Sequence, residues 1–132
     1  MKILIVDDSE LIRERLIDSL KRLKNIEIAG EAKNGVEALQ MIKDKTPDFV
    51  IMDIRMPEMN GITVLEKMNE LGLKSIVCIF TNYPYLQYKQ KCFKIGANFF
   101  FDKNINFQEV IDEVTKLSEN LKKPFNDFKK YS

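Results

Sequence analysis

The chain has 132 residues and a mass of 15.4 kDa, which is the size of one ordinary domain, so we expect no separate output domain. With 45% hydrophobic and 31% charged residues, the composition is that of a folded globular protein and excludes a disordered one. The 21 basic and 20 acidic side chains leave a net charge of +1, so bulk charge supplies no affinity for nucleic acid.

The N-terminus lacks a signal-peptide core, and no apolar run approaches the roughly 20 residues that span a bilayer. We therefore expect a cytoplasmic protein without a membrane contact. Cys78 and Cys92 have no metal-ligand spacing, which favours small core hydrophobes in a reducing compartment. The chain contains no histidine, which excludes Ser-His and Cys-His catalysis and most zinc sites.

The elements follow one another in a regular alternation of apolar runs and helical spacing. Lys2–Val6 predicts a strand, and apolar residues from Ile12 to Leu23 predict a helix behind Ser9 as N-cap. A second round follows, with a strand at Ile26–Ala32 and a helix at Val36–Ile42 that an Asn-Gly pair introduces.

The alternation continues through the rest of the chain. Phe49–Met52 predicts the third strand, and Ile62–Leu71 predicts a helix that a glycine ends. Ile76–Phe80 predicts the fourth strand, before a helix at Leu86–Ile95. The last pair is a strand at Asn98–Phe101 and a helix at Phe107–Leu117, with Pro124 as its stop.

Five continuous apolar strands, each followed by a helix, indicate an α/β protein whose parallel sheet is covered on both faces. We predict a doubly wound sheet of five strands, for which the flavodoxin-like order 2-1-3-4-5 is one of the common alternatives. One domain would span residues 1–121, and residues 122–132 would form a short C-terminal tail. Such sheets bind ligands beyond the carboxyl ends of their strands, where the strand order reverses.

Polar residues follow four of the predicted strands: Asp7 and Asp8 the first, Asp53 the third, Thr81 the fourth and Lys103 the fifth. With the first and third strands adjacent, three carboxylates meet in one crevice. Like charges at such short range raise each other's pKa, so the group needs a cation. Oxygen ligands without histidine or cysteine favour Mg²⁺, and Lys103 would supply the remaining counter-charge.

A Mg²⁺ ion beside a lysine and a hydroxyl can hold a phosphoryl group, because phosphoryl transfer depends mainly on positioning and charge neutralisation. Asp53 is the predicted acceptor, and its product is an aspartyl phosphate. Since the chain has no histidine as general base, it would depend on an already activated donor.

Several motifs now agree in order and spacing: Ile3–Ser9, Asn34–Leu39, Asp53–Gly61, Thr81, and Gly96-Ala97 ahead of Lys103. Over residues 1–121 the chain resembles a response-regulator receiver domain of two-component signalling, of the chemotaxis-regulator type. The resemblance implies that a histidine kinase or phosphotransfer protein donates a phosphoryl group to Asp53. It also implies that Asp8, Asp53 and the backbone carbonyl of Arg55 hold Mg²⁺, while Asp7 acts through metal-bound water.

The same resemblance implies a switch and an output surface. Thr81 and Lys103 would contact phosphoryl oxygens, and Phe100 matches the aromatic switch position. Receivers of this type signal through the face of their fourth and fifth helices, and residues 74–101 hold lysines and tyrosines but no acid. We expect a downstream protein to bind this surface. Two alternatives are that the surface is simply solvated, or that it forms a homodimer on phosphorylation. No nucleic-acid contact is predicted for this chain.

The chain departs from the family pattern around the site. Asn104 follows Lys103 where proline is usual, and a cis peptide without proline would cost about 3 to 4 kcal/mol, which favours a rearranged loop. Asn82 follows Thr81 where a very small residue is usual. Phe100 has no hydroxyl. Arg55 and Tyr83 would flank the mouth of the site, and their bulk predicts a long-lived phosphoryl group.

Three other functions compete with the phosphorylated switch. A hydrolase of the haloacid dehalogenase type needs a second acid two residues after its nucleophile, where this chain has Arg55. A flavin or dinucleotide binder lacks its glycine-rich turn here. A receiver-like interaction module, in which Asn82 and Asn104 have impaired phosphorylation, is the stronger alternative, although Asp8, Asp53, Thr81 and Lys103 are all present.

Overall fold

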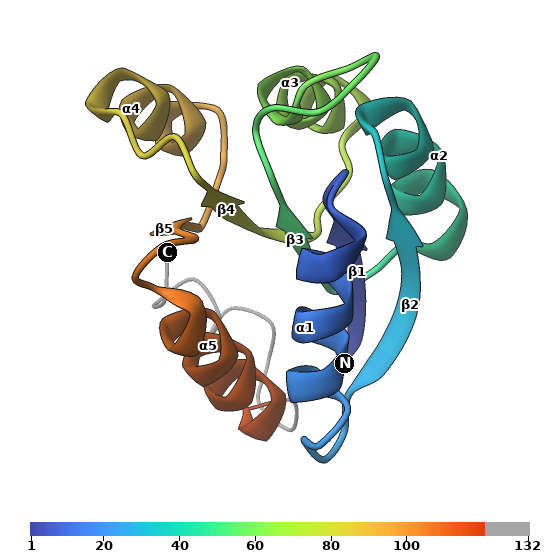
Figure 1. Cartoon of the computed structure of the whole chain (residues 1–132). Coiled ribbons are helices and arrows are strands. Elements are labelled where there is room, and N and C mark those ends of the chain that lie inside the picture. The colour runs from blue at the N-terminus through green and yellow to red at the C-terminus, as the bar shows by residue number, and fades with distance from the viewer. Residues whose placement is uncertain (121–132) are drawn as a thin grey trace.

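The computed structural model describes residues 1–120, and they form one parallel five-stranded sheet in the order β2-β1-β3-β4-β5 (Figure 1). Each strand is followed by a helix, which confirms the predicted architecture and strand order. The strands are β1 (Lys2–Val6), β2 (Glu27–Ala32), β3 (Phe49–Met52), β4 (Ile76–Thr81) and β5 (Phe99–Asp102). The helices are α1 (Glu10–Leu20), α2 (Gly35–Lys45), α3 (Gly61–Leu71), α4 (Leu86–Lys94) and α5 (Phe107–Glu119).

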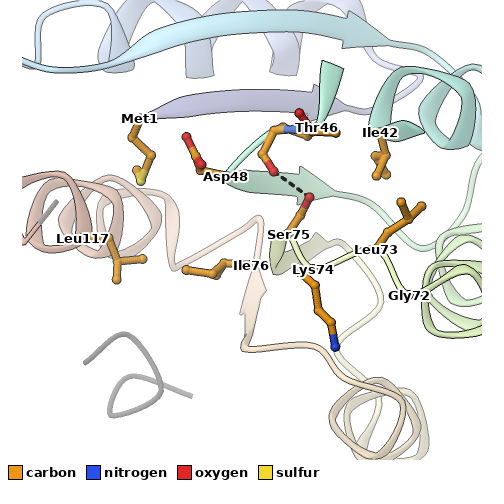
Figure 2. Close-up of a pocket in the computed structure, with 11 residues that line it drawn as sticks. Met1, Ile42, Thr46, Asp48, Gly72, Leu73, Lys74, Ser75, Ile76 and Leu117 are labelled. Carbon is orange, nitrogen blue, oxygen red and sulfur yellow. Dashed lines mark hydrogen bonds between the residues drawn. The ribbon is translucent and has the colours of Figure 1, made fainter. Parts of the chain in front are cut away.

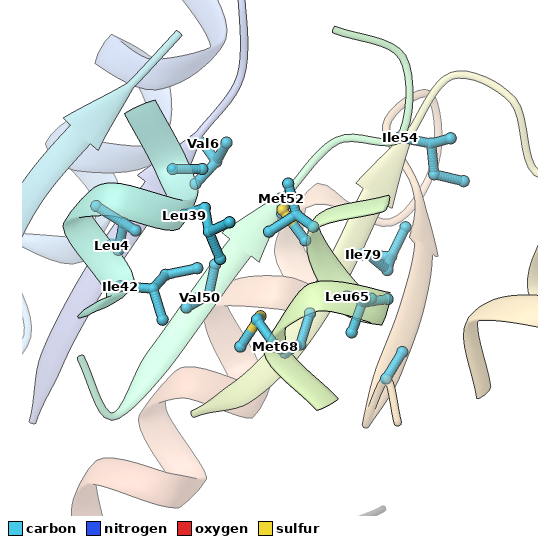
Figure 3. Packing of buried hydrophobic residues seen from close by; sticks show 14 of the residues in the cluster. Leu4, Val6, Leu39, Ile42, Val50, Met52, Ile54, Leu65, Met68 and Ile79 are labelled. Carbon is cyan, nitrogen blue, oxygen red and sulfur yellow. The ribbon is translucent and has the colours of Figure 1, made fainter. Parts of the chain in front are cut away.

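Two apolar cores lie on opposite faces of the sheet because successive side chains of a strand point to opposite sides. Leu4 and Val6 of β1 pack in the core under α2, α3 and α4, which Figure 3 shows from close by. Ile3 and Ile5 pack in the core under α1 and α5. A sheet buried on both faces explains why its strands read as continuous apolar runs instead of alternating ones.

The two cysteines confirm the prediction of small core residues. Cys78 lies in the core under α1 and α5, and Cys92 lies in the core on the other face; both are free and fully buried. Desolvation by burial raises the pKa of both thiols, to about 11 for Cys92. Neither thiol is therefore a nucleophile at neutral pH.

Side-chain caps set the starts of three helices. Ser9 Oγ accepts a hydrogen bond from Ile12 N at 3.3 Å, as predicted for α1. Asn34 caps α2, where its Oδ1 accepts from Glu37 N at 2.8 Å. Asn60 caps α3 in the same way. These local hydrogen bonds satisfy donors that the first turn of a helix leaves unpaired.

The predicted end of the first helix is wrong by one turn. The apolar spacing extended to Leu23, but α1 ends at Leu20. Leu23 N donates to Leu20 O at 3.0 Å in a turn, and its partly buried side chain still packs against the core under α1 and α5. Apolar periodicity indicates which residues are buried, but a turn can bury a residue just as a helix can. The spacing therefore does not show where the helix ends.

Some sequence expectations lie outside the described residues, namely the domain boundary at 121, the tail 122–132 and the stop at Pro124. Within residues 1–120, none of the helices has the length and apolar character that a membrane span requires. No peptide bond of these residues is cis, so the bond between Lys103 and Asn104 is trans.

Candidate functional site

The carboxyl ends of neighbouring strands bring the predicted site residues to one edge of the sheet. Asp7 follows β1, and Asp53 follows β3, where its amide donates to Val6 O at 3.1 Å. Thr81 ends β4, and Lys103 follows β5, where its amide donates to Thr81 O at 2.9 Å. Because β1, β3, β4 and β5 are successive neighbours in the sheet, residues far apart in the sequence become adjacent here.

Asp7, Asp8 and Asp53 form a cluster that we call the acidic triad. One carboxylate oxygen from each lies within 4.8 Å of the others. Asp7 is 2% exposed and Asp53 5%, whereas Asp8 is exposed. Three oxygen donors, two of them buried and one open to solvent, fit a hard divalent cation that keeps several waters, as Mg²⁺ does. The donor set therefore fits the predicted metal.

Lys103 lies between the two buried carboxylates. Its Nζ is 2.5 Å from Asp7 Oδ2 and 2.7 Å from Asp53 Oδ2, and the lysine side chain is only 5% exposed. Burial by itself lowers the pKa of Lys103, but the hydrogen bonds and charges of Asp53 and Asp7 outweigh it and raise the pKa. Lys103 is therefore fully charged at neutral pH.

The pKa of Asp7 is raised above its ordinary value, and desolvation by burial is the main cause. Its hydrogen bonds with Lys103 and with Ser9 N, the latter at 2.9 Å, act in the opposite direction but do not cancel the effect of burial. The Asp53 charge adds to the increase. The site thus holds its negative charge at a cost, which a bound cation would reduce.

Thr81 of β4 and Phe100 of β5 are both buried. Thr81 is fully buried, and its Oγ1 accepts a hydrogen bond from Tyr83 N at 3.1 Å. Phe100 of β5 is 9% exposed and packs against Phe93 of α4, with ring centroids 6.4 Å apart. Thr81 thus contacts the loop before α4, and Phe100 contacts α4 itself.

An arginine and three tyrosines form a contact that the sequence did not reveal. The Arg55 guanidinium lies 3.8 Å from the ring centroid of Tyr83, and Nη2 donates to Tyr88 OH at 3.3 Å. The Tyr85 ring lies 6.3 Å from Tyr83 and 5.7 Å from Tyr88. We predicted that Arg55 and Tyr83 flank the site. The only signal for their contact was three closely spaced tyrosines, which do not identify a partner.

The loop after β5 is held by side chains instead of a proline. Asp102 Oδ1 accepts from Asn104 N at 2.8 Å, and Asn106 Oδ1 accepts from Asp102 N at 2.9 Å. Asn106 N also donates to Asp102 O at 2.8 Å. These bonds are the local turns that Asp and Asn favour. They fix the backbone on both sides of Lys103 with a trans peptide.

A pocket of about 360 Å³ lies at the opposite, amino-terminal edge of the sheet (Figure 2). Leu73, Ile76 and Leu117 are among its lining residues, and Ser75 Oγ donates to Pro47 O at 2.7 Å beside it. None of the predicted site residues lines it. Its mainly apolar lining offers no phosphoryl chemistry, so the candidate site remains the carboxyl edge.

Gly61 packs directly against the backbone of the predicted acceptor. A Cβ atom at this position would lie 2.2 Å from Asp53 O, closer than any real contact. Gly61 N also donates to Ile54 O at 2.7 Å. The close approach of the Asp53 carbonyl is therefore the reason for a glycine here.

Gly61→Ala is therefore expected to lower the free energy of unfolding by about 1 to 3 kcal/mol, since the loop or α3 must move to make room. Urea denaturation measures this. Gly30→Ala is the matched control, because a Cβ at Gly30 meets nothing closer than 3.4 Å. Equal losses in both variants would contradict the packing argument.

Comparison with known proteins agrees with this geometry. The family model described as "Response regulator receiver domain" matches residues 3–115. The chain is 35% identical over 114 residues to the chemotaxis protein CheY of Halobacterium salinarum, which covers 86% of this chain and 93% of that protein. It is 32% identical over 111 residues to BvgA of Bordetella pertussis, covering 84% of this chain and 53% of BvgA. The chain thus spans about half the length of several curated relatives that it matches.

Solved structures share the fold. The signal receiver domain of NarL from Mycobacterium tuberculosis has a TM-score of 0.82 at 26% identity, covering 89% of this chain and 95% of that one. A chain in the CheX–CheY–BeF3–Mg²⁺ complex from Borrelia burgdorferi has a TM-score of 0.81 at 28% identity, covering 89% and 88%. With its strand order, its acidic triad and a family match over residues 3–115, this chain belongs to the response-regulator receiver domains of two-component systems.

Proposed function

We propose that this receiver accepts a phosphoryl group on Asp53 from a histidine kinase or phosphotransfer protein and thereby changes its partner-binding face. One observation supports this most directly. Lys103 bridges Asp7 and Asp53 inside an acidic triad at the carboxyl edge of the sheet. A buried lysine beside a carboxylate nucleophile can stabilise the negative charge of phosphoryl oxygens.

Each residue has a role in the proposed transfer. An Asp53 carboxylate oxygen attacks the phosphorus, and the bond to the donor's leaving group breaks, so no general base is needed. Lys103, already 2.7 Å from Asp53, would neutralise charge on the phosphoryl oxygens. Thr81 Oγ1 uses its acceptor side for Tyr83 N, which leaves the hydroxyl hydrogen available for a phosphoryl oxygen.

The metal completes the proposed site. Asp8, Asp53 and the backbone carbonyl of Arg55 would hold Mg²⁺, with Asp7 acting through a metal-bound water. When bound, the ion supplies charge neutralisation for the transferring phosphoryl group. In support, the structurally similar CheX–CheY complex contains both BeF3 and Mg²⁺.

We also propose that the new charge acts on the α4 segment. A hydrogen bond donated by the Thr81 hydroxyl to the phosphoryl group would reorient the side chain that also accepts from Tyr83 N, and Phe100 packs against Phe93 of α4. The exposed surface of α4 includes Leu86 and Phe93, at 66% and 42% exposure. Together with exposed lysines, this surface suits a downstream protein on the face of α4 and α5. A homodimer through this face is a different outcome of the same switch.

The wider context is also a proposal. Residues 1–121 would form the receiver domain. Two free, buried cysteines fit a reducing compartment such as the cytoplasm. Because the chain spans about half of several relatives, the activities of those longer proteins do not enter this proposal.

Intact mass spectrometry after incubation with acetyl phosphate tests the acceptor. We expect one phosphoryl adduct on the wild type in Mg²⁺ and none in EDTA. Asp53→Asn should give none under either condition. Asp18→Asn, which alters an exposed acid on α1, should react like the wild type. An adduct that persists in Asp53→Asn would contradict the assignment.

A phosphorylation-impaired interaction module is the alternative function. Asn82 follows Thr81 where a very small residue is usual, and Asn82 is exposed. In that case neither acetyl phosphate nor a panel of phosphorylated histidine kinases would give an adduct. Partner binding would then be the same for the wild type and Asp53→Asn.

The contact of Arg55 with Tyr83 predicts a slow loss of the phosphoryl group. In this proposal the two side chains flank the site, where they would obstruct water. Arg55→Ala is expected to speed first-order loss by roughly two- to fivefold, the equivalent of an exposed cation–π contact. The decay of the mass adduct measures it. Arg15→Ala is the matched control, since Arg15 stacks on Phe107 at 4.6 Å outside this contact. Equal decay in all three proteins would contradict the prediction.

A further inference from the structure

Arg13 of α1 makes two hydrogen bonds that the sequence does not predict. Its Nη1 donates to the backbone carbonyl of Asp7 at 2.8 Å, and its Nε donates to Glu31 Oε1 at 3.0 Å. The arginine side chain is 15% exposed, and the Glu31 side chain is 44% exposed. A mostly buried arginine side chain therefore joins the end of β2 to the loop that carries two members of the acidic triad.

The Asp7 carbonyl belongs to the peptide unit that links Asp7 to Asp8. A peptide unit is planar, so fixing its oxygen also fixes the amide of Asp8 and the direction in which the chain leaves Asp7. Other bonds hold the Asp7 side of this unit. Asp7 N donates to Ala32 O at 3.0 Å, and Asp7 Oδ1 accepts from Ser9 N at 2.9 Å. Arg13 holds the carbonyl itself.

Asp8 depends on this backbone more than the other two acids do. Asp7 and Asp53 are buried and paired with Lys103, whereas the Asp8 side chain is exposed. An exposed carboxylate gains little orientation from packing, so its direction follows that of the backbone that carries it. The hydrogen bond from Arg13 to the Asp7 carbonyl is thus placed to orient Asp8, the only exposed member of the acidic triad.

We propose that Arg13, itself oriented by Glu31, is a positioning residue for the divalent cation site of the acidic triad. This inference rests on the proposed function, because it requires that the triad binds Mg²⁺. Arginine suits the task since its planar fork presents Nε and Nη1 to two acceptors at once, which the single ammonium of lysine cannot do in the same geometry. Outer residues that orient metal ligands usually change metal affinity about 10- to 100-fold when they are replaced.

Mg²⁺ titration by isothermal calorimetry on the full chain tests the proposal. We expect Arg13→Gln to raise the Kd for Mg²⁺ about tenfold or more. Arg13→Lys, which keeps the charge and the aliphatic stem, should raise it by less. Lys21→Gln is the matched control, because Lys21 lies just beyond α1 in an exposed ion pair with Asp18; its Kd should equal that of the wild type.

Hydrogen exchange in EDTA separates positioning from a plain structural tie between α1 and β2. If Arg13 positions the loop, the amides of Asp8 and Ser9 exchange faster in Arg13→Lys, while the amide of Val64 in α3 keeps its wild-type rate. A uniform increase at all three amides would instead indicate loss of global stability and would overturn the proposal.

The outcomes distinguish this inference from the function on which it rests. If the wild type does not bind Mg²⁺, the proposed metal site fails, and the role of Arg13 fails with it. If the wild type binds Mg²⁺ and a folded Arg13→Lys or Arg13→Gln binds it equally well, only the role of Arg13 is overturned. Should Arg13→Gln not fold, Arg13→Lys decides.

Discussion

Lys103→Met is expected to lower the free energy of unfolding of the metal-free protein by about 3 kcal/mol at neutral pH. The substitution leaves Asp7 and Asp53, which are 2% and 5% exposed, without their shared cation. Breaking a buried ion pair by removing one partner is costly because an uncompensated charge remains. Urea denaturation in EDTA measures the change.

The pH dependence follows from the raised pKa of Lys103. A base whose pKa is higher in the folded state binds its proton more tightly there, so folding gains stability while the group is charged. This contribution is fully present below the ordinary value of 10.5 and is lost as the pH rises through the folded pKa. The difference between wild type and Lys103→Met therefore shrinks in strong alkali, where Lys103 loses its proton. It also shrinks in acid, where Asp7 takes up a proton and no longer needs a counter-charge.

Mg²⁺ should restore part of the stability that Lys103→Met loses, because a bound cation takes over the neutralisation of the two acids. Lys116→Met is the control, since Lys116 makes an exposed pair with Glu113 that contributes little. Equal unfolding free energies of Lys103→Met and wild type in EDTA would contradict the role of Lys103 as counter-charge.

Asp7→Asn is expected to stabilise the metal-free protein at neutral pH and to weaken Mg²⁺ binding about tenfold or more. Burial raises the pKa of Asp7 in spite of Lys103, so the ionised carboxylate costs folding free energy. The amide is uncharged and of the same shape, and Lys103 keeps Asp53 as its partner. Stability and metal affinity thus change in opposite directions.

The stability contribution of Asp7 depends on pH in the opposite direction to that of a salt-bridged acid whose pKa is lowered in the folded state. Because folded Asp7 holds its proton more tightly than the unfolded chain does, the wild type gains stability as the pH falls through the folded pKa toward 3.8. The advantage of Asp7→Asn is therefore largest at neutral pH and disappears on acidification. Urea denaturation in EDTA between pH 4 and 8 measures it, and a variant that is less stable than the wild type at pH 7 would contradict the argument.

The parts of the site that could be predicted are those that strand order controls. Asp7 and Asp53 are separated by many residues, yet both directly follow apolar strands, and two parallel strands that are neighbours end at the same edge. The Ser9 cap was predictable for a different reason, because its bond to Ile12 N spans only three residues. The sequence indicates both local hydrogen bonds and the positions at which strands end.

The contacts that could not be predicted join side chains from different elements. Arg55 meets Tyr88 across 33 residues, and Arg13 meets Glu31 across 18. Long flexible side chains have many possible partners, and the sequence does not rank them. The end of α1 at Leu20 is a similar case, because Leu23 is buried by a turn that the apolar spacing does not distinguish from a helix.

The sequence by itself determined the class of this protein, the positions of its strands along the chain and the set of acids, hydroxyl and lysine at their carboxyl ends. These depend on apolar periodicity and on the rule that parallel strands end together. Only the tertiary structure decided that Lys103 bridges two buried acids, that Gly61 is required by the Asp53 carbonyl and that Arg13 holds the Asp7 peptide. Those contacts depend on distances of a few ångströms between segments that are far apart in the sequence. Side-chain packing determines these distances, and local sequence patterns do not show them.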